Sequence, residues 1–279
     1  MKHRPADVSA VVCTMNSGPS IEACLRSLRA AGVGQVIVVD AHSTDGTYEI
    51  AMDLADMVMR DEGAGLARAR NIGIAQTSGS LVLNMGSDNV ITASNLSRMI
   101  DTLESLGVQG VSARTRVIGN GYVARAMDAW RSSRFRPGPS RIIGTPTLFI
   151  GDLLRAHPFN PMTTVSDDSE LCERWATDLG STFAISDAYI EEFGKASMRE
   201  TWIRCRMYGS SDAEIYRHGL SQGWSLRRRW QSILHPFSAD LVGPIRVLSA
   251  RDRVRYGPYL VAFTAMRYAG WIRACLKRR

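Results

Sequence analysis

The amino-acid sequence predicts an α/β fold with a mostly parallel sheet flanked by helices and a helical C-terminal extension. Short apolar runs of strand length alternate with helical patterns over residues 8–85, and from about residue 199 the pattern is mostly helical. Of the 279 residues, 45% are hydrophobic and 22% are charged. This composition is typical of a protein with a substantial core, and it excludes a mainly disordered chain.

The first half of the chain predicts four strands, over residues 8–14, 35–40, 57–61 and 80–85. The first of them is an apolar, β-branched run, and the second is a run typical of a buried strand. Helical patterns separate them, and the first of these helices closes at Gly32 and the third near Gly79. Such strands pair in parallel through right-handed crossovers, and their ligand crevice lies beyond the carboxyl ends of the strands. The candidate site residues are therefore 14–17, 40–45, 61–65 and 86–89.

The second half of the chain has a less regular pattern. Residues 107–160 mix short strands with a helix near residues 121–134, and residues 167–180 predict a helix with acids in its first turn. One or two strands are expected to follow. The C-terminal helices are expected to break at Gly223, His235–Pro236 and Gly257–Pro258.

The charge of the chain is unevenly distributed. Residues 1–198 carry 18 Lys and Arg against 22 Asp and Glu, whereas residues 199–279 carry 16 against 5. The basic C-terminal region predicts a polyanionic partner, either nucleic acid or an anionic membrane surface. Since no nucleic-acid-binding module is recognisable, we expect no nucleic-acid partner.

Cysteine usage and the absence of several motifs narrow the function further. The five cysteines are scattered and form no CxxC pair, which favours a reducing compartment over a disulfide framework. No secretory signal is visible, so a cytoplasmic location is expected. No GxGxxG follows a strand, and GxxxxGK[ST] and GxSxG motifs do not occur. A Rossmann dinucleotide site, a P-loop and an α/β-hydrolase nucleophile are therefore not supported.

Two acidic sites, Asp40 and the pair Asp167–Asp168, have competing interpretations when they are taken alone. Asp40 ends a strand and faces the crevice, where a carboxylate suits an N–H of a bound base or a ribose hydroxyl, whereas Ser43 and Thr44 are typical helix caps. Asp167 and Asp168 either complement a helix dipole as first-turn acids or belong to a functional site. The residues alone leave these alternatives open.

Several longer segments stand in one order along the chain. The first strand is followed by TMNSGPSIEACLRSL, and the end of the second strand lies in VVDAHSTDGT. A helix, a strand and an acidic turn then follow in GLARARNIGIAQTSGSLVLNMGSDN. This series resembles the family-2 inverting glycosyltransferases, which have a GT-A fold and use nucleotide sugars. A looser match, TPTLFIGDLL followed by TTVSDDSELCERW, extends the resemblance to about residue 195.

The resemblance implies a division of the chain into domains. Residues 1–198 would form a GT-A-like catalytic domain, with a nucleotide-binding half over residues 8–106 and an acceptor half over residues 107–198. Residues 199–279 would form a basic, mainly helical C-terminal region. Donor and acceptor choice would depend on the variable middle segment and on this region.

The resemblance also implies which residues bind the donor. Thr14 and Asn16 would line the nucleotide pocket, and Asp40 would bind the base, for which uracil, and hence UDP, is expected. Arg70, in the ARARN segment, would lie near the nucleotide or its diphosphate.

Two further acids carry the chemistry that the resemblance implies. Asp88 would belong to the Asp-x-Asp turn that holds Mg²⁺ or Mn²⁺ with the donor, and Asp168 matches the general base that deprotonates the acceptor hydroxyl. Asp167 beside it would raise the apparent pKa of the pair. The chain departs from the family at Gly86, which replaces the first acid of the turn, and at Glu191–Glu192, where many relatives place a histidine. Glu191–Glu192 are therefore left without a role.

These features predict an enzyme that moves a sugar, with inversion, from a nucleoside diphosphate sugar to a hydroxyl of a glycan or lipid-linked acceptor, as in the synthesis of cell-envelope polysaccharides. The alternative, motivated by Gly86, is a catalytically inactive nucleotide-sugar-binding or scaffold protein of the same fold.

The segment from Tyr259 to Ile272 is apolar apart from Arg267, and it is too short to span a bilayer of ~30 Å comfortably. It predicts either a helix packed on the protein or an interfacial helix with Arg273 and the basic residues 277–279 on anionic lipid. The second alternative would place the protein peripherally on the inner face of the membrane.

Overall fold

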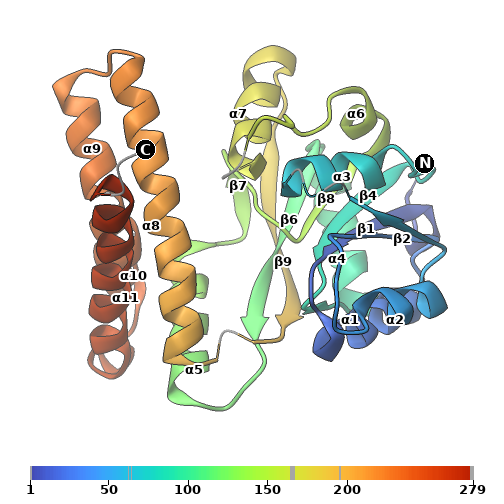
Figure 1. Cartoon of the computed structure of the whole chain (residues 1–279), viewed down its shortest axis with the longest axis horizontal. Helices are drawn as coiled ribbons and strands as arrows, with labels where there is room; N and C mark the ends of the chain where they lie inside the picture. The colour runs from blue at the N-terminus through green and yellow to red at the C-terminus, as the bar shows by residue number, and fades with distance from the viewer. Residues whose placement is uncertain (1, 62, 64, 164–166, 195, 277–279) are drawn as a thin grey trace. The chain divides into compact units, whose positions relative to one another are not determined.

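The computed structural model describes residues 2–276 apart from residues 62, 64, 164–166 and 195, so the basic residues 277–279 lie outside the described part. The chain divides into two compact units (Figure 1). The N-terminal unit joins Met1–Arg116 with Arg136–Phe193, and the C-terminal unit joins Val117–Phe135 with Gly194–Arg279. None of the described helices is long and apolar enough to cross a membrane.

The predicted α/β fold is confirmed. Four parallel strands form one half of the sheet: β1 (Val8–Thr14), β2 (Gln35–Asp40), β3 (Met57–Arg60) and β4 (Leu81–Gly86). The strands β1, β2 and β4 are buried on both faces, as continuous apolar runs in a covered parallel sheet should be. They lie in the order β3-β2-β1-β4, so the chain reverses direction across the sheet between β1 and β4.

The other half of the sheet is largely antiparallel. It contains β5 (Asn89–Val90), β6 (Gly110–Val117), β7 (Gly138–Ser140), β8 (Thr147–Ile150) and β9 (Phe183–Glu192). The strand order continues from β4 through β8, β6 and β9 to β5, and β7 pairs with β9. β8 runs antiparallel to both β4 and β6, and β5 runs antiparallel to β9. This half therefore extends the parallel sheet beyond β4.

Helices cover both faces of the sheet in the N-terminal unit. Val12 and its neighbours on one face pack against α1 (Gly18–Ala30), α2 (Thr47–Leu54) and α4 (Ala93–Leu106). Val11 and Val82 face the other side, where they pack with residues of α3 (Leu66–Ile74), α6 (Gly151–Ala156) and α7 (Asp167–Leu179). Adjacent residues of β1 thus enter different cores, as the two-residue period of a strand requires. A short 3₁₀ turn, η1 (Pro5–Asp7), precedes β1.

The C-terminal unit is helical. It contains α5 (Tyr122–Arg134), α8 (Met198–Ser221), α9 (Leu226–Pro236), the π-helix η2 (Phe237–Val242), α10 (Gly243–Val247) and α11 (Ala250–Leu276). Trp130 of α5 packs on Phe263 of α11 with 4.8 Å between ring centroids. The expected acceptor half included residues 121–134, but in the structure these residues pack with the C-terminal helices. A domain boundary at residue 198 stays a prediction.

Two of the three expected helix breaks do not occur. At His235–Pro236 the backbone stays helical from α9 through η2 into α10. The chain was expected to break at Gly257–Pro258, yet α11 continues through both residues. A proline inside a helix costs about 3 kcal/mol because it removes one hydrogen bond and crowds the preceding turn. Tyr256, Tyr259 and Leu260 are buried on both sides of Pro258 in the sequence, and this packing outweighs the local cost. The expected break at Gly223 is present, since Gly223 has a φ of 72° between α8 and α9.

Candidate active site

Parallel pairing brings the predicted donor-site residues to one edge of the sheet. Thr14, the last residue of β1, is opposite Asp40, the last residue of β2, and Cys13 is opposite Gly86, the last residue of β4. The loops that follow these strands therefore leave the sheet side by side. This edge is the carboxyl end at which parallel α/β sheets bind ligands.

Asp40 organises the loop after β2. Its carboxylate is completely buried, and it accepts hydrogen bonds from the backbone N–H and the hydroxyl of Ser43 at 3.0 and 2.5 Å. Ser43 Oγ in turn accepts from the Asn16 N–H at 2.8 Å, and Asn16 Oδ1 accepts from the Thr44 N–H at 3.0 Å. Asn16 has a φ of 50°, so the loop after β1 turns in a conformation that asparagine tolerates. Asp40 thus caps this loop, and contact with a base stays a prediction.

Polar atoms without a hydrogen-bond partner lie on the strands beneath this edge. The Thr14 hydroxyl is buried and has no partner among the described residues. Both polar atoms of the Asn84 amide and the hydroxyl of Thr147 are also buried without a partner among the described residues. Asn84 and Thr147 are opposite each other in the register of β4 and β8. Buried polar groups are usually hydrogen-bonded, so these atoms are candidates for contacts to water or to a polar ligand.

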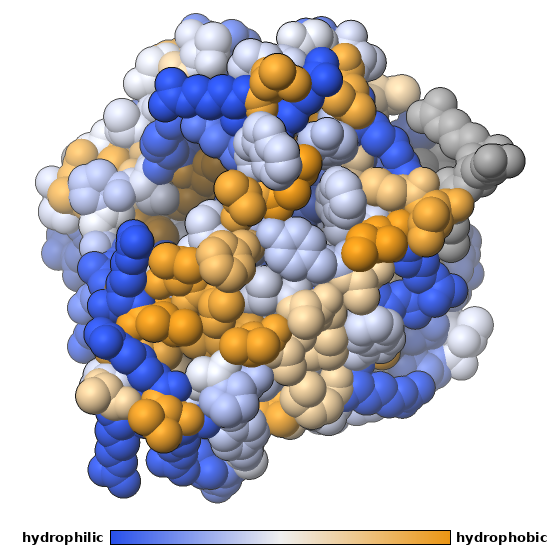
Figure 2. Space-filling model, turned by 90° about the vertical axis from the view of Figure 1, so that its left-hand side faces the viewer, coloured by the Kyte–Doolittle hydropathy of each residue, from blue (hydrophilic) through white to orange (hydrophobic). Residues whose placement is uncertain are grey.

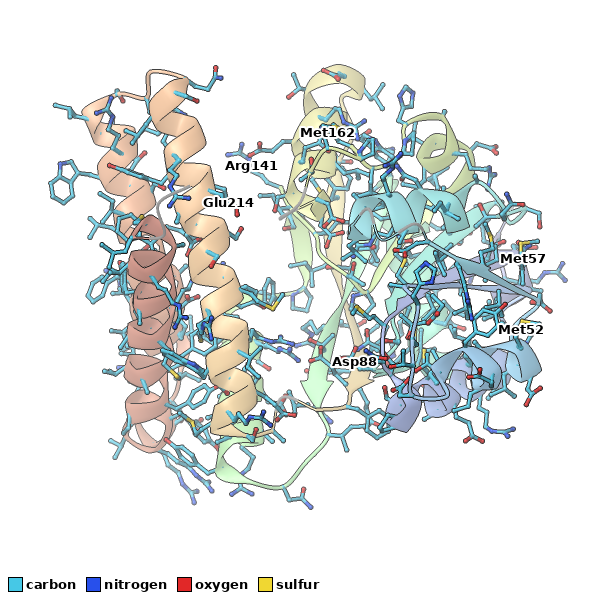
Figure 3. All side chains as sticks on the ribbon, viewed as in Figure 1. Met52, Met57, Asp88, Arg141, Met162 and Glu214 are labelled. Atoms are coloured by element: carbon cyan, nitrogen blue, oxygen red, sulfur yellow. The ribbon has the colours of Figure 1, made fainter. Side chains whose placement is uncertain are left out.

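The acidic turn after β4 is compact around Gly86. A Cβ atom at this position would lie 2.8 Å from Asp88 Oδ1 and 2.9 Å from Asn89 Oδ1, so these side chains occupy the space that a larger residue would need. Asn89 Oδ1 accepts from the Gly86 N–H at 3.1 Å. Ser87 is joined to the start of α1, because its hydroxyl lies 2.8 Å from that of Ser17. Asp88 is labelled in Figure 3.

The acidic turn holds one of the two acids that the family usually has there. No group of three or more His, Cys, Asp or Glu side chains in the described part of the chain could hold a metal ion. Magnesium-type sites often use one or two carboxylates together with the phosphates of the substrate. Asp88 fits that minimal donor set.

Glu192 is a neighbour of the turn that the sequence analysis left without a role. In the antiparallel pair of β5 and β9, Asn89 is opposite Glu192 and Val90 is opposite Glu191. The Phe193 N–H donates to the Asp88 carbonyl at 2.7 Å. The pair Glu191–Glu192 was visible in the sequence, but only the strand pairing places it beside Asp88.

A second charged cluster lies at the start of α7. Arg70 of α3 donates from Nη1 to Asp167 Oδ2 at 2.6 Å and to Asp168 Oδ1 at 3.0 Å. Its Nη2 donates to Thr145 Oγ1 at 2.5 Å, and its guanidinium lies 4.9 Å from the centroid of the Phe159 ring. Arg70 therefore holds the predicted base and its neighbour, whereas its expected contact with a diphosphate stays a prediction.

Asp168 is the residue of this cluster best suited to proton transfer. Its side chain is 21% exposed, against 13% for Asp167 and 7% for Arg70. Thr145 N–H donates to Asp168 Oδ2 at 3.2 Å, which fixes the second carboxylate oxygen. Burial raises the pKa of Asp168 and the Asp167 charge adds to that rise, while Arg70 opposes it. The carboxylate is thereby held in place and made more basic than an ordinary aspartate.

Thr145 is a site residue that sequence reasoning missed. It contacts both Arg70 and Asp168, and it stands at the start of the TPTLFIGDLL segment that extends the family resemblance. The sequence motif that contains Thr145 was recognised as part of the family resemblance. A single threonine, however, has no sequence feature that predicts its contact with a charged cluster. The predicted site residues therefore fall into two groups. One group lies at the carboxyl edge of the sheet and contains Thr14, Asp40 and the turn with Asp88. The other is the cluster of Arg70, Asp167, Asp168 and Thr145.

Two solved structures have the same fold. The mannosyltransferase PcManGT from Pyrobaculum calidifontis, in complex with GDP-Man and Mn²⁺, matches with a TM-score of 0.64 at 19% identity, over 99% of this chain and 89% of that one. TarS 1–349 from S. aureus matches with a TM-score of 0.54 at 19% identity, over 95% of this chain and 88% of that one. Both are GT-A glycosyltransferases, and at these identities the likeness shows the GT-A fold alone.

Sequence comparison gives relatives and a family. Glycosyltransferase AglE of Haloferax volcanii is 27% identical over 157 residues, which are 51% of this chain and 52% of AglE. Glycosyltransferase AglJ of the same organism is 26% identical over 144 residues, or 47% of this chain and 48% of AglJ. The chain thus spans about half the length of these relatives. The profile described as Glycosyl transferase family 2 matches residues 9–159, more than half of the chain, and the chain therefore belongs to glycosyl transferase family 2.

Proposed function

We propose that this protein transfers a sugar from a nucleoside diphosphate sugar, with UDP as the nucleotide, to an acceptor hydroxyl with inversion at the anomeric carbon. The observation that carries the proposal is the placement of Asp168. It is a partly exposed carboxylate with a raised pKa, and Arg70 and Thr145 fix its two oxygens. Membership of the family and the nucleotide-sugar complexes of structural neighbours support it.

Inverting transfer is a single in-line displacement. The acceptor oxygen forms a bond to the anomeric carbon, the bond from that carbon to the diphosphate oxygen breaks, and the acceptor proton passes to a base. Asp168 takes this proton in its ionised form, and burial and the Asp167 charge, which raise its pKa, make that carboxylate more basic than usual. Arg70 and Thr145 are positioning residues, since they act through Asp168.

The donor is held at the edge formed by β1, β2 and β4. Thr14 offers a buried hydroxyl without a partner in the described chain, and Asp40 and Asn16 shape the loops that would enclose the base. Asp88 would hold Mg²⁺ or Mn²⁺ together with the donor phosphates. When bound, such a cation stabilises the negative charge that develops on the departing diphosphate.

The acceptor in this proposal is a hydroxyl of a glycan or of a lipid-linked sugar at the cytoplasmic face of a membrane, as in the synthesis of cell-envelope polysaccharides. The basic composition of residues 199–279 supports this location.

A second candidate function is a nucleotide-sugar-binding protein without turnover. Gly86 favours it, because the first acid of the turn is replaced by a glycine whose space Asp88 and Asn89 fill.

Labelled UDP-sugars separate the two functions. The purified chain is incubated with each donor, with and without Mn²⁺, and the release of UDP and the transfer of label to water or acceptor are measured. We expect release that requires Asp168. Donors that raise the melting temperature but are never cleaved, under any of these conditions, would replace the transferase proposal with the binding protein.

A further inference from the structure

The outward surface of α11 is apolar along most of its length. Val254, Val261, Ile272 and Leu276 follow one another at helical spacing, and their exposed fractions are 82%, 54%, 50% and 75%. An ordinary surface helix shows polar residues on that side. The aromatic residues Tyr259 and Phe263, by contrast, are buried in the core of the C-terminal unit. The exposed apolar stripe of α11 therefore does not take part in the packing of the C-terminal unit.

The neighbouring helix α9 and the start of η2 carry a second apolar stripe. Leu226, Trp230, Leu234 and Phe237 are spaced by four, four and three residues, and all are exposed, Leu226 by 72% and Trp230 by 62%. Such spacing puts them on one side of a helix. The two stripes lie on helices that touch, because Tyr268 of α11 donates from its hydroxyl to the Ile233 carbonyl of α9 at 2.7 Å. We call the two stripes together the apolar face.

Figure 2 looks onto the side of the molecule that carries α9 and α11. Apolar residues gather there in broad areas bordered by hydrophilic ones. Exposed apolar areas of this kind, rimmed by polar residues, mark sites of contact with another surface.

The rim of the apolar face is positively charged. Helix α9 contains Arg227, Arg228 and Arg229 and no acid, and α11 contains Arg273 near its C-terminal end and Asp252 as its one acid. Arg273 stands between two concave regions. One is an apolar groove that it lines with Ala269, Ile272 and Leu276. The other is a polar cavity of about 280 Å³ between α8 and α11, in which Arg206, Arg217 and Arg273 outnumber the one acid, Glu214. Apolar and cationic contacts are thus adjacent, as an amphiphile with an anionic head requires.

We propose that the apolar face docks on an anionic phospholipid bilayer, with the two stripes among the acyl chains near the surface and the arginines at the lipid phosphates. Trp230 is suited to the interface, because its ring is apolar on its faces and polar at its N–H. A second copy of this chain is a poorer occupant, since its apolar face would bring an equal set of arginines against the first. Neither helix spans the bilayer in this arrangement, and both lie along its surface.

This inference refines the proposed membrane location of the acceptor, and it is tested without turnover. The full chain is floated with vesicles of phosphatidylcholine containing about one-third phosphatidylglycerol, and with vesicles of phosphatidylcholine alone. The double variant Leu234→Ser/Ile272→Ser is compared with Met52→Ser/Leu106→Ser. The control removes two residues of the N-terminal unit that are equally exposed, at 55% and 48% against 50% for each of the tested pair.

We expect the parent chain to bind the anionic vesicles, and the Leu234→Ser/Ile272→Ser variant to bind at least about tenfold more weakly. The Met52→Ser/Leu106→Ser control should bind like the parent. Arg227→Gln/Arg273→Gln should weaken binding by about 25-fold, since each surface arginine contributes about fivefold. Arg26→Gln/Arg98→Gln, which removes the same charge from the N-terminal unit, should have a smaller effect. Because all these side chains are exposed, melting temperatures are expected to stay near that of the parent, which serves as the folding check.

Three results would overturn the inference. The first is a parent chain that does not bind anionic vesicles at low salt, and the second is equal binding to neutral vesicles. The third is a parent chain that self-associates through the apolar face, so that Leu234→Ser/Ile272→Ser converts dimers to monomers without changing vesicle binding. Failure of vesicle binding alongside normal UDP-sugar turnover would refute the docking face and leave the proposed reaction standing.

Discussion

Each unit of the chain buries an arginine between two aspartates, and the two clusters differ in how their charges balance. Among the described residues of the N-terminal unit, Arg70 is the one basic side chain paired with Asp167 and Asp168, so this described cluster has one carboxylate in excess, and Asp168 keeps contact with solvent.

In the C-terminal unit, Arg267 contacts both Asp212 and Asp240, and Arg134 of α5 donates to the other oxygen of Asp240 at 2.7 Å. Two arginines face two aspartates, and Asp240 is completely buried. Among the described residues the charges of this cluster balance, and Asp240 has no access to solvent, so the cluster can hold α5, α8, η2 and α11 together while Asp240 cannot reach a substrate proton. An unbalanced carboxylate with access to solvent distinguishes a reactive cluster from a structural one.

The largest expected effect is on the reactive cluster. A general base contributes roughly 10²–10⁴-fold to a rate, so Asp168→Asn should lose that factor in transfer of labelled sugar. Its affinity for UDP should persist, because the base contacts the acceptor rather than the nucleotide. The melting temperature should change little, since the amide oxygen still accepts from Thr145. Glu170→Gln, which changes another acid in the first turn of α7, is the matched control and should remain active. An active Asp168→Asn together with an inactive Asp167→Asn would move the base by one residue.

The second prediction concerns the structural cluster. Asp240→Asn leaves Arg134 and Arg267 short of one negative charge in a buried site, and breaking such an arrangement costs about 3–5 kcal/mol of unfolding free energy. Glu214→Gln, at an exposed acid of the same unit labelled in Figure 3, should stay within about 0.5 kcal/mol of the parent. Urea unfolding measures both. Equal stability of the two variants would remove the distinction between the clusters.

A third prediction concerns the acidic turn, which contains one aspartate, Asp88, whereas each of the two clusters contains two. If Asp88 holds the cation, the rise in melting temperature that Mn²⁺ adds to UDP binding should vanish in Asp88→Ala. Gly86→Ala and Gly86→Asp both place a Cβ against Asp88 and Asn89, at a cost of about 1–3 kcal/mol from overpacking. A stronger Mn²⁺ effect in Gly86→Asp than in Gly86→Ala would isolate the contribution of the missing acid. The metal site is refuted if Mn²⁺ never alters UDP binding in the parent.

The smallest expected effect is on pH dependence. The proposed base, Asp168, can take a proton only when it is ionised, and its pKa is raised, so kcat/KM should fall with decreasing pH in a range above the ordinary aspartate value of about 3.9. Asp167 raises that pKa, so Asp167→Asn should move the acidic limb of the profile to lower pH. Arg70 lowers it, so Arg70→Gln should move the limb to higher pH. Shifts in the reverse directions would contradict the assignment of Asp168 to the limb.

Local pattern was sufficient to predict the parallel half of the sheet. The apolar runs at 8–14 and 35–40 coincide with β1 and β2, because a strand buried on both faces needs a continuous apolar run. Asp168 was identified from a motif whose residues are neighbours in sequence. The contact between Arg70 and Asp168 could not be predicted, because it joins residues 98 positions apart and depends on how α3 and α7 cover the same face of the sheet.

The helical region was predicted less well for the same reason. Residues 117–135 have no local signal that assigns them to the C-terminal helices, and the packing of Trp130 on Phe263 makes that assignment. Tyr259 and Phe263 belong to the segment for which an interfacial helix was one of two alternatives, yet they are core residues, and the exposed stripe consists of other positions of the same helix. Which face of an amphipathic helix is buried depends on its neighbours, so sequence alone did not assign it.

The anomeric configuration of the product tests whether Asp168 acts as the base of a single displacement, because such a displacement must invert the reacting carbon. The chain transfers a sugar to the acceptor from a UDP-sugar of known α configuration, and NMR of the anomeric proton gives the configuration of the isolated glycoside. We expect a β-linked product from the parent chain, formed roughly 10²–10⁴-fold more slowly by Asp168→Asn. An α-linked product would contradict a single displacement with Asp168 as its base.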